Sequence, residues 1–231
     1  MKKILSTTAI AGSLCLLGTS LLQAQTFKGP YIDVSGAMGG VSTKVSKTGG
    51  TTLSSSTGDG QVGKVFGFGS IGLGYAIPMS KEASFAIGAT YVPGKAEIKG
   101  QATDSGTTAA DGDNTVTFTL KDLYTIYAQP TFEINKDAAA FIRVQYMKAD
   151  VNGTNSANTV SGIPGDIDGW GYGGGLKVAL NKNAYVQTEI MFTELDAITA
   201  KTRTNRVNVT RTYSASKPEL IEGRITLGYQ F

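Results

Sequence analysis

Apolar residues recur at every second position through most of this chain, and this period predicts β-strands rather than helices. The segment 221–231 shows the pattern most clearly. Its odd positions hold Ile, Gly, Ile, Leu, Tyr and Phe, whereas its even positions include Glu222, Arg224 and Gln230. The same alternation recurs in four other segments: 85–91, 142–147, 170–180 and 186–192. Each of these strands is therefore expected to have one apolar and one polar face.

Three further segments, 31–41, 62–76 and 116–133, alternate less regularly. In the last of them Asp122 interrupts a run of apolar residues of one parity, and in 62–76 the parity changes after Phe68. Such a change within one strand is typical of a β-bulge, or of a strand end that has left an apolar environment.

Short and long connections alternate between the predicted strands. Short polar turns are expected near 78–81, 135–137 and 181–183. Four long loops rich in Ser, Thr, Gly and Asn are predicted at about 42–61, 99–114, 152–168 and 201–217. An even strand number with alternating turn lengths is typical of barrels that cross bacterial outer membranes. The predicted fold of residues 25–231 is all-β: a transmembrane antiparallel up-and-down β-barrel of eight strands.

The first 24 residues have the composition of a secretory signal peptide. Two lysines precede an uncharged apolar run from Ile4 to Leu22, and cleavage is expected after Ala24. The single cysteine, Cys15, would leave with this segment, so no disulfide is expected. Removing two of the 21 basic residues leaves 19 against 18 acidic ones, a net charge of +1 that gives no general attraction to nucleic acid. Sec-type export to the outer membrane of a Gram-negative bacterium is expected.

The mean hydropathy of -0.04 is that of an ordinary soluble protein, so a soluble barrel must be compared with a membrane barrel. The positions of the aromatic residues favour the membrane. One group lies beside the short turns or chain ends: Phe27, Tyr31, Tyr75, Phe85, Phe132, Phe141, Tyr185, Tyr229 and Phe231. A second group lies about one membrane-strand length away: Phe66, Tyr91, Phe118, Tyr146, Trp170 and Phe192. Two such bands are typical of the aromatic girdles of outer-membrane barrels.

Glycine is unusually frequent, at 30 of 231 residues. An eight-stranded barrel has an interior only wide enough for packed side chains. Glycines of inward parity are therefore expected to make room for the inward Arg, Lys and Glu side chains. These glycines are Gly72, Gly74, Gly88, Gly171, Gly173, Gly175 and Gly228. The alternative interpretation is that they mark weak strands.

Three segments carry a resemblance to a known family: residues 29–37 (GPYIDVSGA), 72–75 (GLGY) and 227–231 (LGYQF). With the signal peptide, they resemble the small outer-membrane β-barrel proteins of the OmpA-barrel, OmpX and opacity type, the "porin family". The alternating apolar residues Leu227, Tyr229 and Phe231 resemble the signal by which the barrel assembly machinery recognises its clients. The resemblance covers the mature chain and implies location and fold, but no activity.

The chain contains no histidine, which excludes Ser-His catalysis and histidine metal sites. The enzymes of the small outer-membrane barrel family resemble one another in needing a catalytic histidine. Because this chain has none, no enzymatic activity is expected. Asp111 and Asp113 lie in a segment without apolar neighbours that could shift their pKa. No catalytic residue, metal site or cofactor is predicted.

Six charged residues have inward parity, and three of each sign are present: Asp33, Glu189 and Glu222 with Arg143, Lys177 and Arg224. Opposite charges in a narrow interior are expected to pair, because an unpaired buried charge is costly. A salt-bridged, closed lumen is the favoured interpretation, and a small porin for passive diffusion of solutes is the alternative.

The last long loop contains five basic residues and no acid: Lys201, Arg203, Arg206, Arg211 and Lys217. It could bind lipopolysaccharide phosphates, a sulfated host glycan or another protein, or it could simply be solvated. Alternation at 206–210 suggests that it extends the last hairpin.

The sequence thus predicts a non-enzymatic monomer whose barrel displays surface loops for adhesion or interaction. Its expected partners are outer-membrane lipid, lipopolysaccharide and the barrel assembly machinery. The alternatives are a small porin and a soluble secreted ligand-binding barrel.

Overall fold

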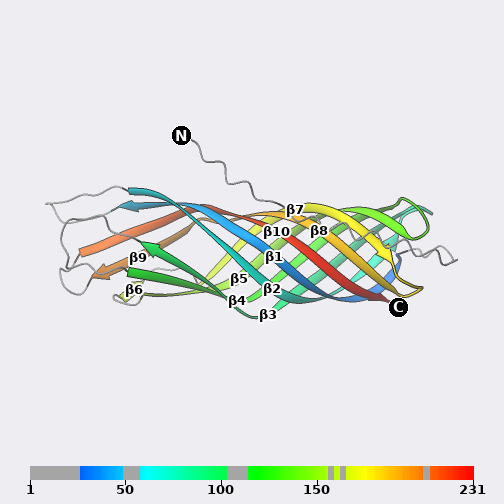
Figure 1. The fold of residues 1–231 in the computed structure, drawn as a ribbon, viewed down its shortest axis with the longest axis horizontal. Coiled ribbons are helices and arrows are strands. Elements are labelled where there is room, and N and C mark those ends of the chain that lie inside the picture. The colour runs from blue at the N-terminus through cyan, green and yellow to red at the C-terminus, as the bar shows by residue number, and fades with distance from the viewer. Residues whose placement is uncertain (1–26, 49–57, 103–113, 156–158, 162–164, 205–208) are drawn as a thin grey trace.

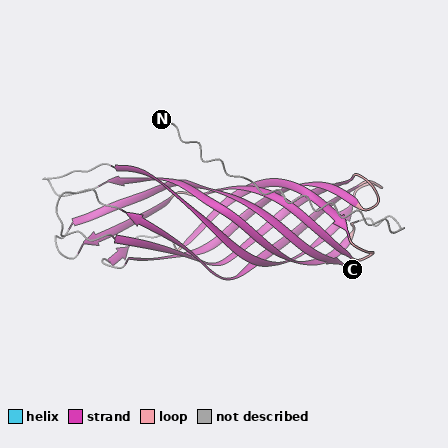
Figure 2. Ribbon diagram, in the orientation of Figure 1, coloured by secondary structure: helices cyan, strands magenta, loops and turns pink. Residues whose placement is uncertain are grey.

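In the computed structural model, the described residues are 27–48, 58–102, 114–155, 159–161, 165–204 and 209–231. The predicted signal peptide lies outside them. All regular elements in these ranges are strands (Figure 2). Their bounds are β1 Gly29–Thr48, β2 Gly58–Pro78, β3 Ala83–Ala102, β4 Asn114–Glu133, β5 Ala138–Asn155, β6 Thr159–Ser161, β7 Asp166–Ala179, β8 Ala184–Leu195, β9 Ile198–Thr204 and β10 Val209–Gln230. No helix among the described residues is long and apolar enough to span a membrane.

Eight of these strands close into an antiparallel barrel in the order β1-β2-β3-β4-β5-β7-β8-β10, and β10 pairs back onto β1 (Figure 1). The predicted up-and-down barrel of eight strands is confirmed. Following paired residues once around the barrel leads from Ile32 to Ser42, ten residues further along β1. This stagger corresponds to a strand tilt of about 40°.

The exterior of the closed part is apolar. Side chains such as Ile32, Leu73, Ile126 and Leu227 are more than half exposed on it. Lipid is the environment in which such a surface is stable, and a closed sheet leaves no strand edge without hydrogen bonds in that environment. Exposed aromatic residues occur at both ends of this zone: Tyr75, Phe132, Tyr229 and Phe231 at one, and Tyr91, Tyr124, Trp170 and Phe192 at the other.

The predicted aromatic bands are partly wrong. Phe27, Tyr31, Phe141 and Tyr185 lie inside the barrel, with 2–4% of each residue exposed, and Phe66 packs against a cluster in the lumen. Nearness to a turn sets the height of a residue in the barrel, whereas its parity decides between lumen and lipid.

At the outer end of the apolar zone the two faces exchange character. Lys148, Glu194 and Glu219 face outward there, beside the buried residues Met147, Leu195 and Leu220. Below this level the exterior is apolar and the adjoining part of the lumen holds buried polar and charged residues. Above it the exterior is charged and the lumen apolar, as in a barrel surrounded by water.

The strands continue well beyond this level, so the predicted loop bounds are wrong. β1 runs to Thr48 and β2 starts at Gly58, inside the loop expected at about 42–61. The loops expected at 99–114, 152–168 and 201–217 likewise contain strand residues of β3, β4, β5, β6, β7, β9 and β10. A crossing strand needs only about 9–11 residues. With 20 residues in β1 and 22 in β10, a large part of each strand lies outside the membrane (Figure 1).

The expected irregularity at Asp122 is confirmed as a bulge. Asp122 has a φ of 49°, and the register between β4 and β5 shifts between Lys121 and Tyr124. The opposite strand is also distorted, since Gly94 has a φ of 109° and the register between β3 and β4 shifts after Val92.

A seam in the barrel wall begins beside this bulge. The pairing of β2 with β3 stops at Ile71 and Tyr91, although both strands continue outward. Among the described residues, no ladder joins β5 to β6 either. The outer part of the barrel therefore consists of two sheets: a small leaf, β3-β4-β5, and a large leaf, β6-β9-β10-β1-β2.

Candidate functional site

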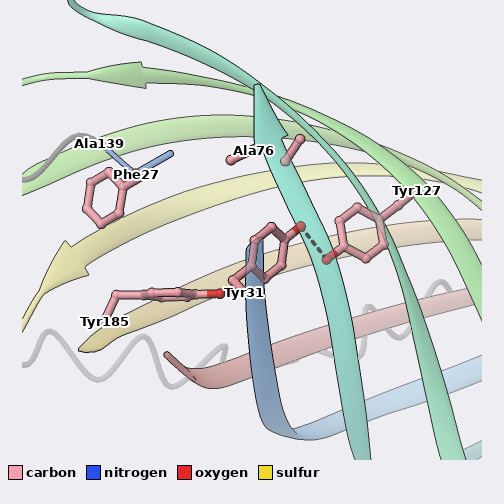
Figure 3. Packing of buried hydrophobic residues seen from close by; sticks show 7 residues of the cluster. Phe27, Tyr31, Ala76, Tyr127, Ala139 and Tyr185 are labelled. Atoms are coloured by element: carbon pink, nitrogen blue, oxygen red, sulfur yellow. Dashed lines mark hydrogen bonds between the residues drawn. The ribbon is translucent and has the colours of Figure 1, made fainter. Parts of the chain in front are cut away.

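The end of the lumen beside the short turns is filled by an aromatic layer (Figure 3). Tyr31 and Tyr127 point toward each other from β1 and β4, and their hydroxyl oxygens are 2.8 Å apart. Tyr185 packs edge-on against Tyr31 and against Phe27, with ring centroids 6.5 and 6.3 Å apart. The chain enters this layer through Gly29, whose φ of 95° is strained for other residues.

Three of the seven inward glycines make room for these rings. A Cβ atom on Gly74, Gly88 or Gly228 would lie 2.0–2.4 Å from the nearest atom of a tyrosine ring or its hydroxyl oxygen. The tyrosines concerned are Tyr31, Tyr127 and Tyr185, respectively. The expectation that these glycines make room for Arg, Lys and Glu is wrong at these three positions, where the side chains accommodated are tyrosines.

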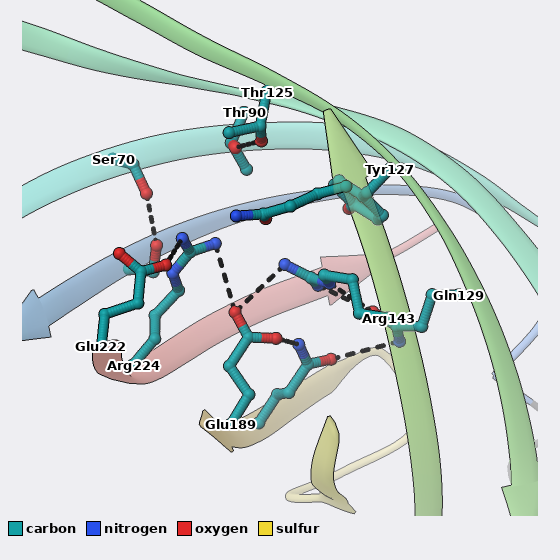
Figure 4. A network of polar contacts seen from close by, with 12 residues as sticks. Ser70, Thr90, Thr125, Tyr127, Gln129, Arg143, Glu189, Glu222 and Arg224 are labelled. Carbon is teal, nitrogen blue, oxygen red and sulfur yellow. Dashed lines mark hydrogen bonds and ion pairs between the residues drawn. The ribbon is translucent and has the colours of Figure 1, made fainter. Parts of the chain in front are cut away.

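Above the aromatic layer lies a charged layer centred on Glu189 (Figure 4). Its Oε1 is 3.2 Å from Nη1 of Arg143 and 3.2 Å from Nη1 of Arg224. Arg224 also contacts Glu222, with 2.5 Å between Nη2 and Oε1. All four side chains are at most 4% exposed. The Arg224 contact with Glu189 is an ion pair without hydrogen-bond geometry, because Nη1 of Arg224 has no acceptor among the described residues.

Two glutamines complete this layer. Arg143 donates from Nε and Nη2 to Oε1 of Gln129, at 3.0 and 2.7 Å. Gln187 donates from Nε2 to Glu189 at 3.2 Å. The guanidinium carbon of Arg143 also lies 4.0 Å from the ring centroid of Tyr127. Sequence reasoning missed Tyr127 and Gln129, although both share the inward parity of Thr125 and Thr131, which could have identified them.

The expected three-to-three pairing of lumen charges is wrong for Asp33 and Lys177. Among the described residues, neither forms an ion pair of the kind that joins the other four. The Lys177 ammonium is enclosed by rings instead, with Nζ 3.7, 4.8 and 5.4 Å from the centroids of Tyr185, Phe27 and Tyr31. Cation–π contacts therefore take the place of a carboxylate.

A third layer, which is apolar, fills the lumen at the outer end. It consists of Met147, Ala149, Val151, Ile167, Leu195 and Leu220, with Phe66 and Leu123 packed against it. Aromatic, charged and apolar side chains thus follow one another along the axis. A barrel of eight strands has no room for a wide water-filled channel beside them.

A family model now identifies the chain. The model of the outer membrane protein β-barrel domain matches residues 9–214. The chain belongs to the outer membrane protein β-barrel family. No curated protein sequence matches it.

Solved barrels of the outer membrane share the fold. OprG of Pseudomonas aeruginosa superimposes with a TM-score of 0.56 at 12% identity, over 91% of this chain and 100% of OprG. Neisserial surface protein A gives 0.40 at 13% identity, over 88% and 97% of the two chains. The outer membrane protease OmpT of Escherichia coli gives 0.46 at 8% identity, over 87% and 97%. The superposition on OprG shows a shared fold alone, because the identity is only 12%.

Membership of the outer membrane protein β-barrel family places the chain in the outer membrane of a Gram-negative bacterium. The family and the apolar exterior together argue against a soluble secreted barrel. Leu227 and Tyr229 of β10 and the adjoining Phe231 all lie on the lipid side, each about half exposed or more. Their recognition by the assembly machinery stays a prediction.

The basic residues of the last predicted loop are distributed over two strands. Lys201 and Arg203 are in β9, Arg211 and Lys217 are in β10, and Arg206 lies outside the described residues. Lys217 forms an exposed ion pair with Glu194, with 2.7 Å between Nζ and Oε1. Its charge is therefore partly neutralised.

A charged belt of exposed polar contacts lies just above the outer aromatic residues, with contacts between β3 and β4, between β5 and β7, and between β8 and β10. Nζ of Lys148 is 2.6 Å from Asp166, and the hydroxyl of Tyr146 donates to Asp168 at 2.7 Å. The bond to Lys148 holds the pKa of the Asp166 carboxyl below its usual range. Within the described residues, no group of three or more acids or cysteines could hold a metal ion.

Proposed function

We propose that this member of the outer membrane protein β-barrel family is a non-enzymatic, non-conducting scaffold that presents its outer strands and loops to the surroundings of the cell. The filled lumen carries this proposal. Three layers of buried side chains, centred on Tyr31, Glu189 and Met147, occupy successive levels of a narrow barrel.

The length of the strands supports the same function. Residues beyond the charged belt are not needed to cross the membrane, yet they form paired strands rather than minimal turns. Such a platform holds its surface residues in fixed register, which suits recognition better than a flexible loop does.

The closed lumen predicts the electrical behaviour of the purified protein. In planar bilayers it is expected to give no stable nanosiemens-scale openings, because both the aromatic and the apolar layer block the axis. Single-channel recording at several voltages checks this. Stable openings would contradict the scaffold proposal and favour the porin alternative.

The seam between β2 and β3 favours a second candidate function. It begins within the apolar zone, and Phe66, Phe68 and Val92 lie next to it with inward parity. Such an opening would connect the apolar outer lumen with the lipid. We propose lateral movement of apolar molecules between these two environments as the alternative to pure display.

Engineered disulfides test whether the seam is open. Ile71→Cys with Tyr91→Cys joins the last paired residues and is expected to form a disulfide readily. Ser70→Cys with Val92→Cys, one position further outward, is expected to remain reduced, because the strands are no longer paired there. Bridging requires Cα atoms within about 7 Å. Equal oxidation of the two variants, measured by thiol labelling, would rule out the seam and with it the lateral pathway.

A further inference from the structure

The three short turns of the barrel share one structure. They follow β2, β4 and β7 and begin with Met79, Ile134 and Leu180. In each turn the backbone N–H groups of the first two residues donate to the carbonyl oxygen of the alanine that begins the next strand, at 2.8–3.3 Å. The second residue is serine in one turn and asparagine in the other two, and its side chain accepts a backbone hydrogen bond. The turns are therefore repeats of one unit in different hairpins.

The third residue of each turn is an exposed lysine: Lys81, Lys136 or Lys182. The first residue is an exposed apolar side chain. The same pattern, an apolar residue followed two positions later by lysine, thus occurs as MSK, INK and LNK. The ion pairs in the described part of the chain involve other cations: Arg143, Lys148, Lys217 and Arg224. The ammonium groups of the turns are therefore available to a ligand.

Each of these lysines ends a lipid-facing row of its hairpin. Leu176, Val178 and Leu180 precede Lys182 at alternate positions and are exposed on the apolar exterior. The rows before the other two lysines contain aromatic and aliphatic side chains: Tyr75, Ile77 and Met79 in one, and Phe132 and Ile134 in the other. At the tilt of this barrel two residues advance by about 5 Å along the axis. The flexible stem of lysine can therefore place its ammonium group at the level of the lipid headgroups.

The charges next to the lysines differ among the three turns. Glu82 directly follows Lys81, and Asp137 directly follows Lys136. Lys182, in contrast, has an asparagine on both sides. A neighbouring carboxylate weakens the attraction of an ammonium group for an anion. The turn with Lys182 is therefore expected to attract an anion most strongly.

We propose that each of the three short turns binds the phosphate group of an anionic phospholipid, in the leaflet beside these turns. The lysine supplies the charge, and the apolar residue two positions earlier contacts the acyl chains. A lipid fits these turns better than a soluble anion, because the apolar and cationic groups recur together on the lipid side. This site lies at the opposite end of the barrel from the proposed display surface and does not depend on that function.

Native mass spectrometry of the mature barrel in neutral detergent tests the assignment. The probes are dioleoyl phosphatidylglycerol and dioleoyl phosphatidylcholine at equal concentration. A lysine beside an anionic headgroup contributes about a fivefold preference, so the wild type is expected to retain one phosphatidylglycerol molecule at each turn. Lys81→Gln, Lys136→Gln, Lys182→Gln is expected to bind both lipids equally. Lys182→Gln alone is expected to lose the most tightly bound molecule.

Two controls separate the position of the charge from its amount. Lys44→Gln, Lys47→Gln, Lys201→Gln removes the same charge from β1 and β9, at positions six or more residues beyond Met38 and Leu195. This variant is expected to keep the preference for phosphatidylglycerol. Replacing the three turn lysines by arginine is expected to keep it as well, because arginine also binds phosphate. Heat-modifiable migration of each variant verifies that it is folded.

Three outcomes would overturn the assignment. Equal losses in both triple glutamine variants would show that the preference follows net charge alone. An unchanged preference in the turn variant would place the bound phosphatidylglycerol elsewhere on the barrel. Release of the lipid by glycerol phosphate in solution, at a similar concentration, would show that the turns bind free phosphate esters rather than the membrane.

Discussion

Glu189→Gln is expected to destabilise the barrel by about 3–5 kcal/mol, the range for breaking a buried ion pair on one side. The Glu189 carboxylate is shared by Arg143 and Arg224 at 3.2 Å each, and none of the three side chains is more than 4% exposed. Removing the negative charge leaves two guanidinium groups close together, with only Glu222 as a carboxylate partner in ion-pair contact.

Unfolding by urea in detergent, followed by tryptophan fluorescence or gel migration, measures this loss. Glu194→Gln is the matched control, because Glu194 lies on the same strand with outward parity and forms an exposed ion pair with Lys217. That change is expected to cost less than about 1 kcal/mol. If both substitutions lowered the free energy of unfolding by the same small amount, the charged layer would not be a principal source of stability.

Gly228→Ala is expected to impair folding strongly, because the new methyl group would lie 2.0 Å from Cζ of Tyr185. Overpacking in a closed interior costs about 1–3 kcal/mol, and more where neither partner can move. Tyr185 is 2% exposed and packs against Phe27, Tyr31 and Lys177. The folded fraction after refolding into detergent, read from heat-modifiable migration, gives the effect.

Two further variants make this test specific to the steric contact. Gly223→Ala changes another glycine of β10, but its new methyl group would meet no atom within 4 Å, so normal folding is expected. Adding Tyr185→Ala to Gly228→Ala removes the ring that the methyl group strikes and is expected to restore part of the folded fraction. If the double variant folded no better than Gly228→Ala, the folding loss would come from the backbone and not from the contact with Tyr185.

The closed barrel could be predicted from the sequence because lipid demands a continuous apolar parity on each crossing strand. The segment 221–231 contains that signal without interruption, and it crosses as the lower half of β10. The inward parity of Glu189 and Arg224 follows from the same alternation. Their contact additionally depends on the register between β8 and β10, which opposes these two residues directly.

The outer strands could not be predicted by the same argument. In the segment 42–48, with the sequence STKVSKT, both faces are largely polar because water lies outside the membrane on either side. Hydrophobic alternation disappears there, although backbone pairing continues to Thr48. The alternation at 206–210 predicts an extension of the last hairpin; Val209 and Thr210 do pair with β9, whereas 206–208 lie outside the described residues.

The surroundings of Lys177 could not be predicted from the alternation of its strand. Its parity predicts that it faces the lumen, but parity does not tell which side chains from other strands reach the same level. The stagger of ten residues around the barrel brings Tyr31 and Tyr185 to it, and the chain before β1 adds Phe27. Register and tilt together determined this environment.

The exchange of faces at the outer boundary fixes how deeply the barrel sits. If the barrel moved into the membrane by the height of two strand residues, Lys148, Glu194 and Glu219 would approach the hydrocarbon. A charged side chain there costs up to about 2–4 kcal/mol at the midplane. Rising by the same amount would expose the apolar exterior residues nearest the short turns, such as Tyr229 and Phe231, to water. With both displacements opposed, the leaf that bears Lys201 stays at a constant distance from the bilayer whatever binds to it.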